Sequence, residues 1–188
     1  MADLLGSVAT TRSNLMEGML YGWDVCRREK RGDKVGKTKK GKGTKLMVIA
    51  DGRGIPLGIH IDSASPSEVK LVDQTLATVR VCCGDRGRPS HRLERLIADR
   101  GYDSDPLRKK LRGLGIEPII PHRAGRKKTP TQDGRGLRRY CRRWIIERTN
   151  AWLQNFRRLV VRYEHSAEIY TGLVHLACAL LTLRRVLG

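Results

Sequence analysis

The chain has 188 residues, which gives room for one ordinary domain with a hydrophobic core, since domains commonly run to ~100–200 residues. Lys and Arg total 38 against 19 Asp and Glu, and this formal excess of +19 indicates a polyanionic partner, with nucleic acid first among them. The five cysteines form no C-x-x-C pair and no Cys/His set at zinc spacing, which excludes a zinc finger and a disulfide framework.

An anionic membrane surface would attract the same charge, but the basic residues do not follow one membrane-facing helix. The longest apolar run, Leu173 to Leu183, is interrupted by His175 and is shorter than the ~20 residues that a membrane helix needs. No signal peptide is recognisable at the start. We therefore expect a cytoplasmic protein without a membrane partner.

Residues 1–31 differ from the rest of the chain because they show neither a two-residue nor a helical repeat of apolar positions. We expect this segment to be poorly structured and to stand apart from a domain at 32–188. The following run, GDKVGKTKKGKGTK, has no apolar face and predicts a solvated basic loop.

The run KLMVIADGRGIPLGIHI predicts two strands, Lys45 to Ala50 and Ile55 to Ile61, which the turn Asp51-Gly52-Arg53-Gly54 joins as a β-hairpin. Apolar residues at helical intervals then predict a helix over Glu68 to Arg80, with Pro66 and Ser67 as its start signal. A short buried strand, Leu96 to Ala98, ends at Asp99.

The second half of the chain is expected to be mostly helical. A helix capped by Ser104 or Asp105 runs to Gly115, and Ile116 to Pro121 is a further buried strand. After a basic, turn-rich loop, one helix of about twenty residues starts at Leu137 and another covers Ala167 to Val186. The order β, β, α, β, α, β, α, α predicts a mixed α/β sheet flanked by helices.

Tyr140, Arg143 and Glu147 form the sharpest candidate site, because spacings of three and seven place them on one helix face. That face would combine a carboxylate for a hard cation such as Mg²⁺ with a guanidinium able to bind a phosphate through two hydrogen bonds. The competing interpretation is an ordinary Arg/Glu ion pair on a solvated helix, which contributes only a few tenths of a kcal/mol.

Asp99 is the second candidate, since a carboxylate at the end of a buried strand is well placed to be a ligand at a sheet edge. The alternative is a turn or capping residue. Asp99 and Glu147 together would supply two carboxylates for metal-assisted phosphodiester cleavage, although two are usually too few for two ions.

Other sequence patterns do not indicate a catalytic or ligand-binding site. The GKT at Gly36 to Thr38 has Arg31 where a phosphate loop needs a glycine, and no histidine pair has the H-E-x-x-H spacing. Trp144 and Trp152 are expected to lie on the buried side of the long helix, in the hydrophobic core. Its arginines either follow DNA phosphates or form a solvated face.

The strings LIADRGYDSDPL and RRYCRRWIIERTNAWLQNFRRLVVRYEHSAEIYTGLVHLACALLTLRRVL, with the Gly/Lys-rich run and hairpin before them, resemble the C-terminal two-thirds of DDE transposases of bacterial insertion-sequence families four and five. The resemblance covers Gly32 to the end. It implies an RNase H-like fold in which two aspartates and a glutamate bind Mg²⁺ or Mn²⁺ for DNA cleavage and strand transfer.

The resemblance assigns the second aspartate to Asp99 and the glutamate to Glu147 of a Y-x-x-R-x-x-x-E signature, with Tyr140 and Arg143 positioning the end DNA. The signature often ends in a basic residue where this chain has Gln154. Backbone phosphates are expected to bind two basic loops, whose residues are Lys37, Lys39, Lys40, Lys42, Arg123, Arg126, Lys127 and Lys128.

The first aspartate is the departure from the pattern. The family has it in a D-G-S-F or D-A-S-F context, whereas this chain has GWDVCRREKRGDKVG. Asp24 is the nearest candidate by position, but its flanks differ and it stands about two residues too close to the loop. The hypothesis that follows is an N-terminal part left incomplete by a frame shift or a rearrangement.

Three functions remain open on this basis. The first is a transposase that cleaves and joins DNA at transposon ends, with DNA as partner and with a homodimer or an association with an intact transposase. The second is a catalytically dead DNA-binding remnant of such a transposase. The third is an unrelated basic nucleic-acid-binding protein, which the signature helix disfavours.

Overall fold

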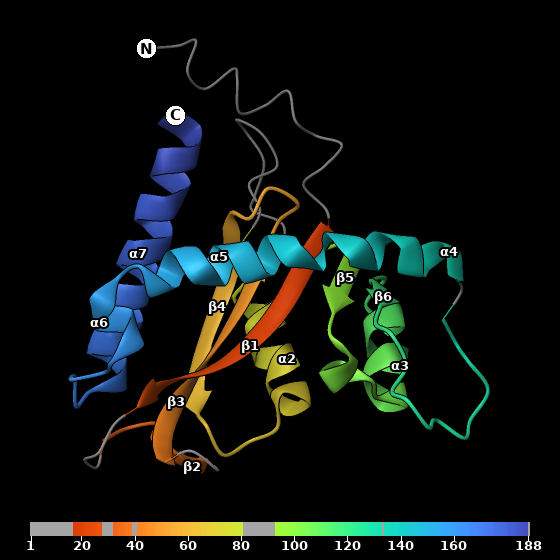
Figure 1. The fold of residues 1–188 in the computed structure, drawn as a ribbon, viewed down its shortest axis with the longest axis horizontal. Helices are drawn as coiled ribbons and strands as arrows, with labels where there is room; N and C mark the ends of the chain where they lie inside the picture. Colours follow the sequence, from red (N-terminus) through yellow and green to blue (C-terminus); the bar gives the residue numbers. More distant parts are fainter. Residues whose placement is uncertain (1–16, 28–31, 39–40, 81–92, 133, 188) are drawn as a thin grey trace.

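The computed structural model describes residues 17–27, 32–38, 41–80, 93–132 and 134–187 (Figure 1). The strands are β1 (Glu17–Arg27), β2 (Gly36–Thr38), β3 (Gly41–Ala50), β4 (Pro56–Ser63), β5 (Arg95–Ala98) and β6 (Glu117–Ile119). The helices are α2 (Glu68–Ala77), α3 (Asp105–Gly113), α4 (Gly134–Leu137), α5 (Trp144–Gln154), α6 (Arg157–Val160) and α7 (Ala167–Leu187), with 3₁₀ segments η1 (Arg100–Tyr102) and η2 (Arg138–Arg143).

The six strands form one mixed sheet in which β1 is central. It pairs antiparallel with β3 on one side and parallel with β5 on the other, and β5 pairs parallel with β6. The far side of β3 pairs antiparallel with both β2 and β4. The expected hairpin is confirmed as β3 and β4, and the expected mixed α/β sheet flanked by helices is confirmed as well.

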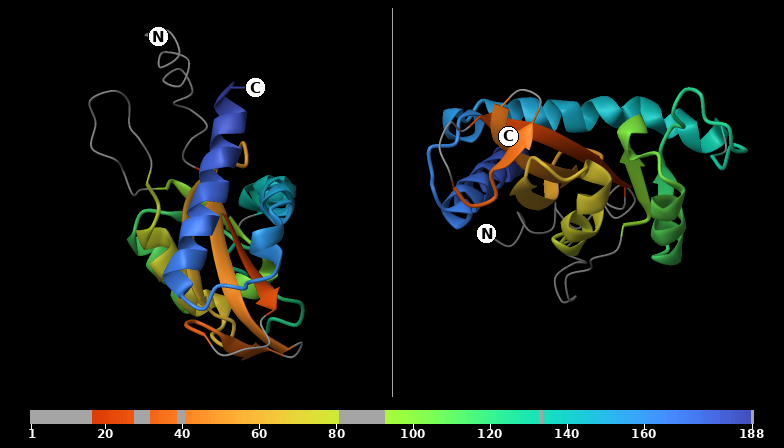
Figure 2. Two further views of the ribbon diagram at one scale, coloured as in Figure 1. Left: turned by 90° about the vertical axis from the view of Figure 1, so that its left-hand side faces the viewer. Right: turned by 90° about the horizontal axis from the view of Figure 1, so that it is seen from below.

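Alternation along β3 divides the core between the two faces of the sheet. Leu46, Val48 and Ala50 pack with α5 and α7, while Met47 and Ile49 pack with α2 and α3. Successive side chains of a strand point to opposite faces, so β3 contributes to both layers of helices. Figure 2 shows the resulting arrangement, with α5 and α7 on one side of the sheet and α2 on the other.

One expectation about the N-terminal part is wrong. Residues 17–27 were expected to be poorly structured, but they form the longest strand and the middle of the sheet. A central strand needs no polar face, because helices cover the sheet on both sides, so a two-residue repeat is not required of it. Residues 1–16 and 28–31 lie outside the described part of the chain.

The basic run after residue 32 is also more ordered than expected. Gly36–Thr38 forms β2, and β3 begins at Gly41 rather than at Lys45. The long helix expected from Leu137 is divided into α4, η2 and α5, which follow one another in one direction (Figure 1). In the 3₁₀ geometry of η2, residues three apart eclipse each other, so Tyr140 and Arg143 are aligned one above the other.

Candidate active site

Asp99 stands where β5 ends and the chain turns into η1. Its backbone is still extended, and its Oδ1 accepts a hydrogen bond of 2.6 Å from the backbone N–H of Arg100. The side chain therefore caps the 3₁₀ turn, which was the structural alternative to a ligand role. It also remains 41% exposed, so that its carboxylate is accessible at the edge of the sheet.

The signature residues of η2 and α5 meet Asp99 at this edge. Nη1 of Arg143 lies 2.8 Å from Oδ1 of Asp99, and the Tyr140 hydroxyl donates to the same oxygen at 3.1 Å. Nε of Arg143 donates to Oε1 of Glu147 at 3.0 Å, and its Nη2 contacts that oxygen as well. The two carboxylates thus converge on one guanidinium from a strand end and a helix.

The surroundings of Arg143 raise the pKa of its guanidinium. Its partial burial by itself lowers the pKa of the guanidinium, but the hydrogen bonds to Glu147 and Tyr140 and the charge of Asp99 raise that pKa above its ordinary value. Carboxylate oxygens are the ligands that Mg²⁺ and Mn²⁺ prefer, so Asp99 and Glu147 fit a hard divalent cation. Within the described residues no group of three or more His, Cys, Asp or Glu could hold a metal ion.

The register of β1 shows how Asp24 lies along the sheet relative to Asp99. Leu20 pairs with Ala98 of β5, so the following residue, Tyr21, occupies the β1 position level with Asp99. Asp24 lies three residues further along the strand, or ~10 Å at ~3.3 Å per residue, and pairs in register with Lys45 of β3. The backbone thus places Tyr21, and not Asp24, level with Asp99.

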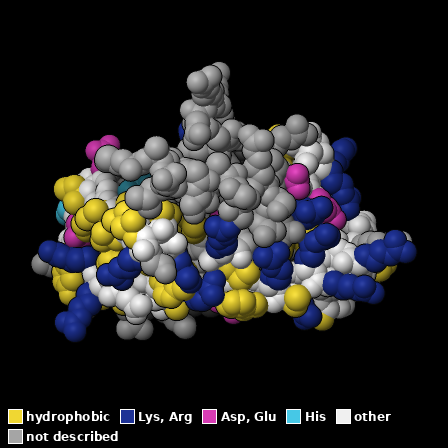
Figure 3. All heavy atoms as spheres, turned by 90° about the horizontal axis from the view of Figure 1, so that it is seen from above, with side chains coloured by type: hydrophobic (Ala, Val, Ile, Leu, Met, Phe, Trp, Pro, Cys, Tyr) yellow, Lys and Arg dark blue, Asp and Glu magenta, His cyan; other side chains and the backbone are white. Residues whose placement is uncertain are grey.

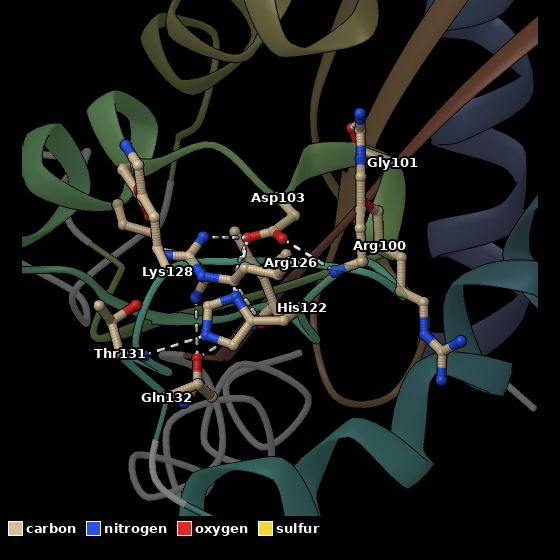
Figure 4. A network of polar contacts seen from close by, with 12 residues as sticks. Arg100, Gly101, Asp103, His122, Arg126, Lys128, Thr131 and Gln132 are labelled. Atoms are coloured by element: carbon tan, nitrogen blue, oxygen red, sulfur yellow. Dashed lines mark hydrogen bonds and ion pairs between the residues drawn. The ribbon is translucent and has the colours of Figure 1, made fainter.

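A buried polar network holds the segment that follows Asp99 (Figure 4). Oδ1 of Asp103 accepts hydrogen bonds from Arg108 at 2.8 Å and from Nδ1 of His122 at 3.0 Å, and Oδ2 accepts the backbone N–H of Arg123 at 2.9 Å. Arg108 is 1% exposed and also donates to the carbonyl of Ile120. The network ties η1 to α3 and to the loop after β6.

The charge of Asp103 is stabilised by these contacts. Burial by itself raises the pKa of the carboxyl, but the hydrogen bonds from Arg108, Arg123 and His122 outweigh it and lower the pKa to about 2. Sequence spacing could not reveal this residue as a central one, since its partners stand five to twenty positions away. The only sequence signal was its place four residues after Asp99 in the D-R-G-Y-D string.

The expected phosphate-binding residues of the second basic loop are partly engaged within the protein. Arg126 pairs with Asp105 at 2.8 Å, and Lys128 lies 3.6 Å from the same carboxylate. Arg123 donates to the carbonyls of Arg100 and Gly101 at 3.2 and 2.7 Å. These contacts bring the loop directly beside Asp99.

Lys37 and Lys42 are exposed at the far end of the sheet, on β2 and β3, and Lys127 is exposed as well. Lys39 and Lys40 lie outside the described residues. In the view from above, basic side chains gather along the side formed by α4, η2 and α5, at the lower edge of Figure 3. The basic surface and the two carboxylates therefore share one side of the molecule.

The fold is thus a helix-flanked mixed sheet in which acidic groups from a strand end and a helix meet at Arg143. The family comparison assigns this domain to a family. The model of the transposase DDE domain matches residues 21–182, and the chain belongs to this family. The expected resemblance to this family is thereby confirmed.

Two relatives are similar over most of the chain. A putative transposase for insertion sequence element IS402 of Burkholderia cepacia is 39% identical over 146 residues, which are 76% of this chain and 65% of the relative. A putative transposase for insertion sequence element IS6501 of Brucella ovis is 31% identical over 142 residues, or 75% of this chain and 98% of the relative. The chain thus spans less than two thirds of the Burkholderia protein.

Solved structures show a weaker likeness. A piggyBac transposase in a synaptic complex with hairpin DNA has a TM-score of 0.43 and 14% identity, covering 63% of this chain and 25% of that one. A Mos1 transposase paired-end complex has a TM-score of 0.36 and 12% identity, covering 79% and 59%.

Proposed function

We propose that this chain carries out metal-dependent cleavage and joining of DNA at insertion-sequence ends, with Asp99 and Glu147 as ligands of Mg²⁺ or Mn²⁺. The observation that supports this most strongly is the convergence of the two carboxylates on Arg143, which brings a strand end and a helix to one point. A solvated i, i+4 ion pair would not explain why Asp99, 48 positions before Glu147, joins the same guanidinium. The proposed site of action is the cytoplasm, on DNA.

The roles follow from the chemistry of each side chain. A divalent cation at this site supplies an activated water and stabilises the leaving oxygen. Asp99 and Glu147 hold and orient the cation through oxygen ligands. Arg143 and Tyr140 can each exchange a carboxylate contact for a non-bridging oxygen of a DNA phosphate, since a guanidinium and a phenol are both donors.

Basic residues around the site would position the DNA backbone without reading sequence. Exposed Lys127 and the loop of Arg123 supply positive charge near the site, to which Arg126 and Lys128 add less because Asp105 pairs with them, while exposed Lys37 and Lys42 would contact DNA further away, at the far end of the sheet. Lys39 and Lys40 complete the proposed phosphate contacts. Such contacts give affinity that falls steeply with salt.

The test is Mn²⁺-dependent nicking of a duplex that carries the cognate terminal repeats. Asp99→Asn and Glu147→Gln should each reduce nicking at least ~100-fold while binding of the same duplex persists, because the changes remove cation ligands and not basic residues. Asp73→Asn is the matched control, since Asp73 is an exposed carboxylate that pairs with Lys110 on α3. Undiminished nicking by both site variants would overturn the assignment.

A second candidate function is a DNA-binding remnant without catalysis, which occupies transposon ends in competition with an intact transposase or in association with it. The observation that favours it is Tyr21 at the β1 position level with Asp99. Asp24 is the catalytic candidate on the same strand. Loss of nicking in Asp24→Asn supports the enzyme, whereas salt-sensitive binding without any nicking by the wild-type chain supports the remnant.

A further inference from the structure

Asn150 is a buried polar residue of α5 whose side chain has no partner. Only 4% of it is exposed, where α5 lies against the sheet (Figure 1), and neither atom of its amide makes a hydrogen bond with any residue that the structure describes. Burying an unpaired amide destabilises a fold, and buried side-chain polar groups almost always have a partner. The adjacent Thr149 follows that rule, since its hydroxyl lies 2.9 Å from the carbonyl of Gly54 and 3.1 Å from that of Ile145. The stability of the core therefore does not account for Asn150.

The position of Asn150 extends the face of the candidate site by one helical turn. Tyr140, Arg143, Glu147 and Asn150 follow one another at spacings of three, four and three residues, and such positions share one side of a helix. Glu147 and Asn150 both belong to α5, so their Cβ atoms are ~5–6 Å apart, a separation that allows a hydrogen bond between their side chains. Asn150 is thus the buried neighbour of a proposed cation ligand.

Glu147 has an acceptor atom that matches the unpaired amide. Both contacts from Arg143, through Nε and Nη2, go to Oε1 of Glu147, and no described residue donates to Oε2. The amide nitrogen of Asn150 is a donor without an acceptor. The two groups are therefore complementary, but they are not hydrogen-bonded to each other while Arg143 holds the carboxylate.

We propose that Asn150 is a positioning residue, which donates a hydrogen bond to Oε2 of Glu147 when Arg143 turns from this carboxylate to a DNA phosphate. The inference rests on the proposed function, in which Arg143 exchanges one contact for the other while Glu147 stays at the cation. At that step Glu147 loses the one described partner that orients it. A donor already placed on the same helix face keeps the carboxylate oriented. The unpaired amide is then a loss of stability that is retained for function.

The hydrogen bond can be detected without metal or DNA, by NMR of the full chain labelled with ¹⁵N. Arg143→Ala removes the competing guanidinium, so the side-chain amide protons of Asn150 should shift downfield from their wild-type position. The shift should disappear when Glu147→Ala is added to Arg143→Ala. The side-chain amide of Asn155, at the exposed end of the same helix, is the control and should not move. An Asn150 resonance that does not shift in Arg143→Ala, or a shift that survives Glu147→Ala, would overturn the proposal.

Binding of Mn²⁺ tests whether the hydrogen bond positions the ligand. Asn150→Leu removes both polar atoms at nearly constant volume, so it should raise the urea midpoint of unfolding. In the Arg143→Ala background the same change should raise the dissociation constant of Mn²⁺ about tenfold, because Glu147 then has no donor, and in the presence of Arg143 the increase should be smaller. Asn155→Leu is the matched control, since it makes the same substitution at an exposed position of α5 and should leave the dissociation constant unchanged.

A purely structural role gives a different result. If Asn150 only fills the core, Asn150→Leu leaves the affinity for Mn²⁺ the same in both backgrounds, and the proposal is overturned. A chain in which Asp99→Asn does not weaken Mn²⁺ binding would instead refute the proposed function. In that case the metal-free amide shift still decides whether Asn150 donates to Glu147, so the two failures are distinguishable.

Discussion

Arg143 occupies the point where the two proposed cation ligands meet. Its guanidinium neutralises Asp99 and Glu147 at the same time, and the hydroxyl of Tyr140 accepts from it at 2.9 Å. In the proposed function, a residue in this position has two opposing effects. It would compete with a divalent cation for the carboxylates, and it would supply a donor for a DNA phosphate.

Arg143→Gln should separate these two effects. Because the variant leaves both carboxylates without their cationic partner, we expect Mn²⁺ to bind about tenfold more tightly, which corresponds to ~1.4 kcal/mol. The affinity for the cognate duplex should fall at the same time, since one phosphate donor is lost. Titration of Mn²⁺ followed by electron paramagnetic resonance measures the first effect, and Arg158→Gln, which removes an exposed guanidinium paired with Glu164, is the control. Weaker Mn²⁺ binding in Arg143→Gln would contradict this account.

Asp103 shows how a residue that touches no substrate holds the site in place. Its carboxylate is 4% exposed and links η1, α3 and the loop after β6. Nε2 of His122 accepts the backbone N–H of Thr131 at 3.1 Å, so Nδ1 carries the proton that is donated to Asp103. The segment that carries Asp99 is thereby attached to α3 and to the loop after β6.

The lowered pKa of Asp103 predicts a specific dependence of stability on pH. Because the pKa falls from 3.8 to about 2 on folding, the charge contributes about 2 kcal/mol above pH 3.8, which is lost as the pH falls towards 2. Asp103→Asn should lose ~3 kcal/mol of unfolding free energy at neutral pH, as Arg108 loses its buried carboxylate partner. Its stability should then change less between pH 4 and 2. Urea unfolding measures both, and an equally steep acid limb in the variant would refute the assignment.

At the scale of elements, the hairpin turn is tied to α5 and so sets where the signature helix lies. Asp51 closes the turn by accepting the backbone N–H groups of Arg53 and Ile55, each at 2.8 Å. The Thr149 hydroxyl of α5 donates to the carbonyl of Gly54 at 2.9 Å. Gly54 has a φ of +87°, a conformation that favours glycine.

Gly54→Ala should therefore destabilise the protein. An added Cβ would lie 2.8 Å from Oγ1 of Thr149, and the positive φ alone costs ~1–2 kcal/mol. We therefore expect the free energy of unfolding to fall by about 2 kcal/mol. Gly113→Ala at the end of α3 is the control, because nothing lies within 4 Å of its Cβ position. Thermal unfolding compares the two variants. Equal melting temperatures would show that the turn is not held against α5.

The register of strand β1 determines which of its residues could supply a third carboxylate to the proposed cation site. The register places position 21 level with Asp99, so Tyr21→Asp should add a third carboxylate and tighten Mn²⁺ binding by about tenfold or more. The same change combined with Asp24→Asn should keep that gain. A gain that disappears in the combined variant would instead place the third ligand at Asp24, in agreement with the candidate taken from the sequence.

Most elements could be predicted from local patterns, and the exceptions have physical reasons. The hairpin, α2, α3, β5, β6 and α7 follow from their apolar spacing and turn residues. Strand β1 could not be predicted, because a central strand covered on both faces has no alternation, and its position depends on pairing with distant segments. The 3₁₀ geometry of η2 could not be predicted either, since the spacing of apolar residues does not distinguish a 3₁₀ helix from an α-helix.

At the scale of the whole molecule, the sheet and the helix layer bring together groups that the chain keeps far apart. Spacing placed Tyr140, Arg143 and Glu147 on one face, and residue chemistry and the family resemblance suggested Asp99 as a further ligand, but spacing could not show that Asp99 meets them in space. The folded chain joins all four through hydrogen bonds and an ion pair. The position of Tyr21 on β1, level with Asp99, depends on strand register, which no local pattern could reveal.

The shared cation is the central claim, and a double-mutant cycle of Mn²⁺ binding tests it most directly. Asp99→Asn and Glu147→Gln should each weaken the same Mn²⁺ site by about tenfold or more, and the double variant should lose little beyond the stronger single effect because the two ligands act on one ion. Asp73→Asn should bind as the wild type does. Unchanged Mn²⁺ affinity in the double variant, or two independent and fully additive losses, would contradict a cation held between the end of β5 and α5.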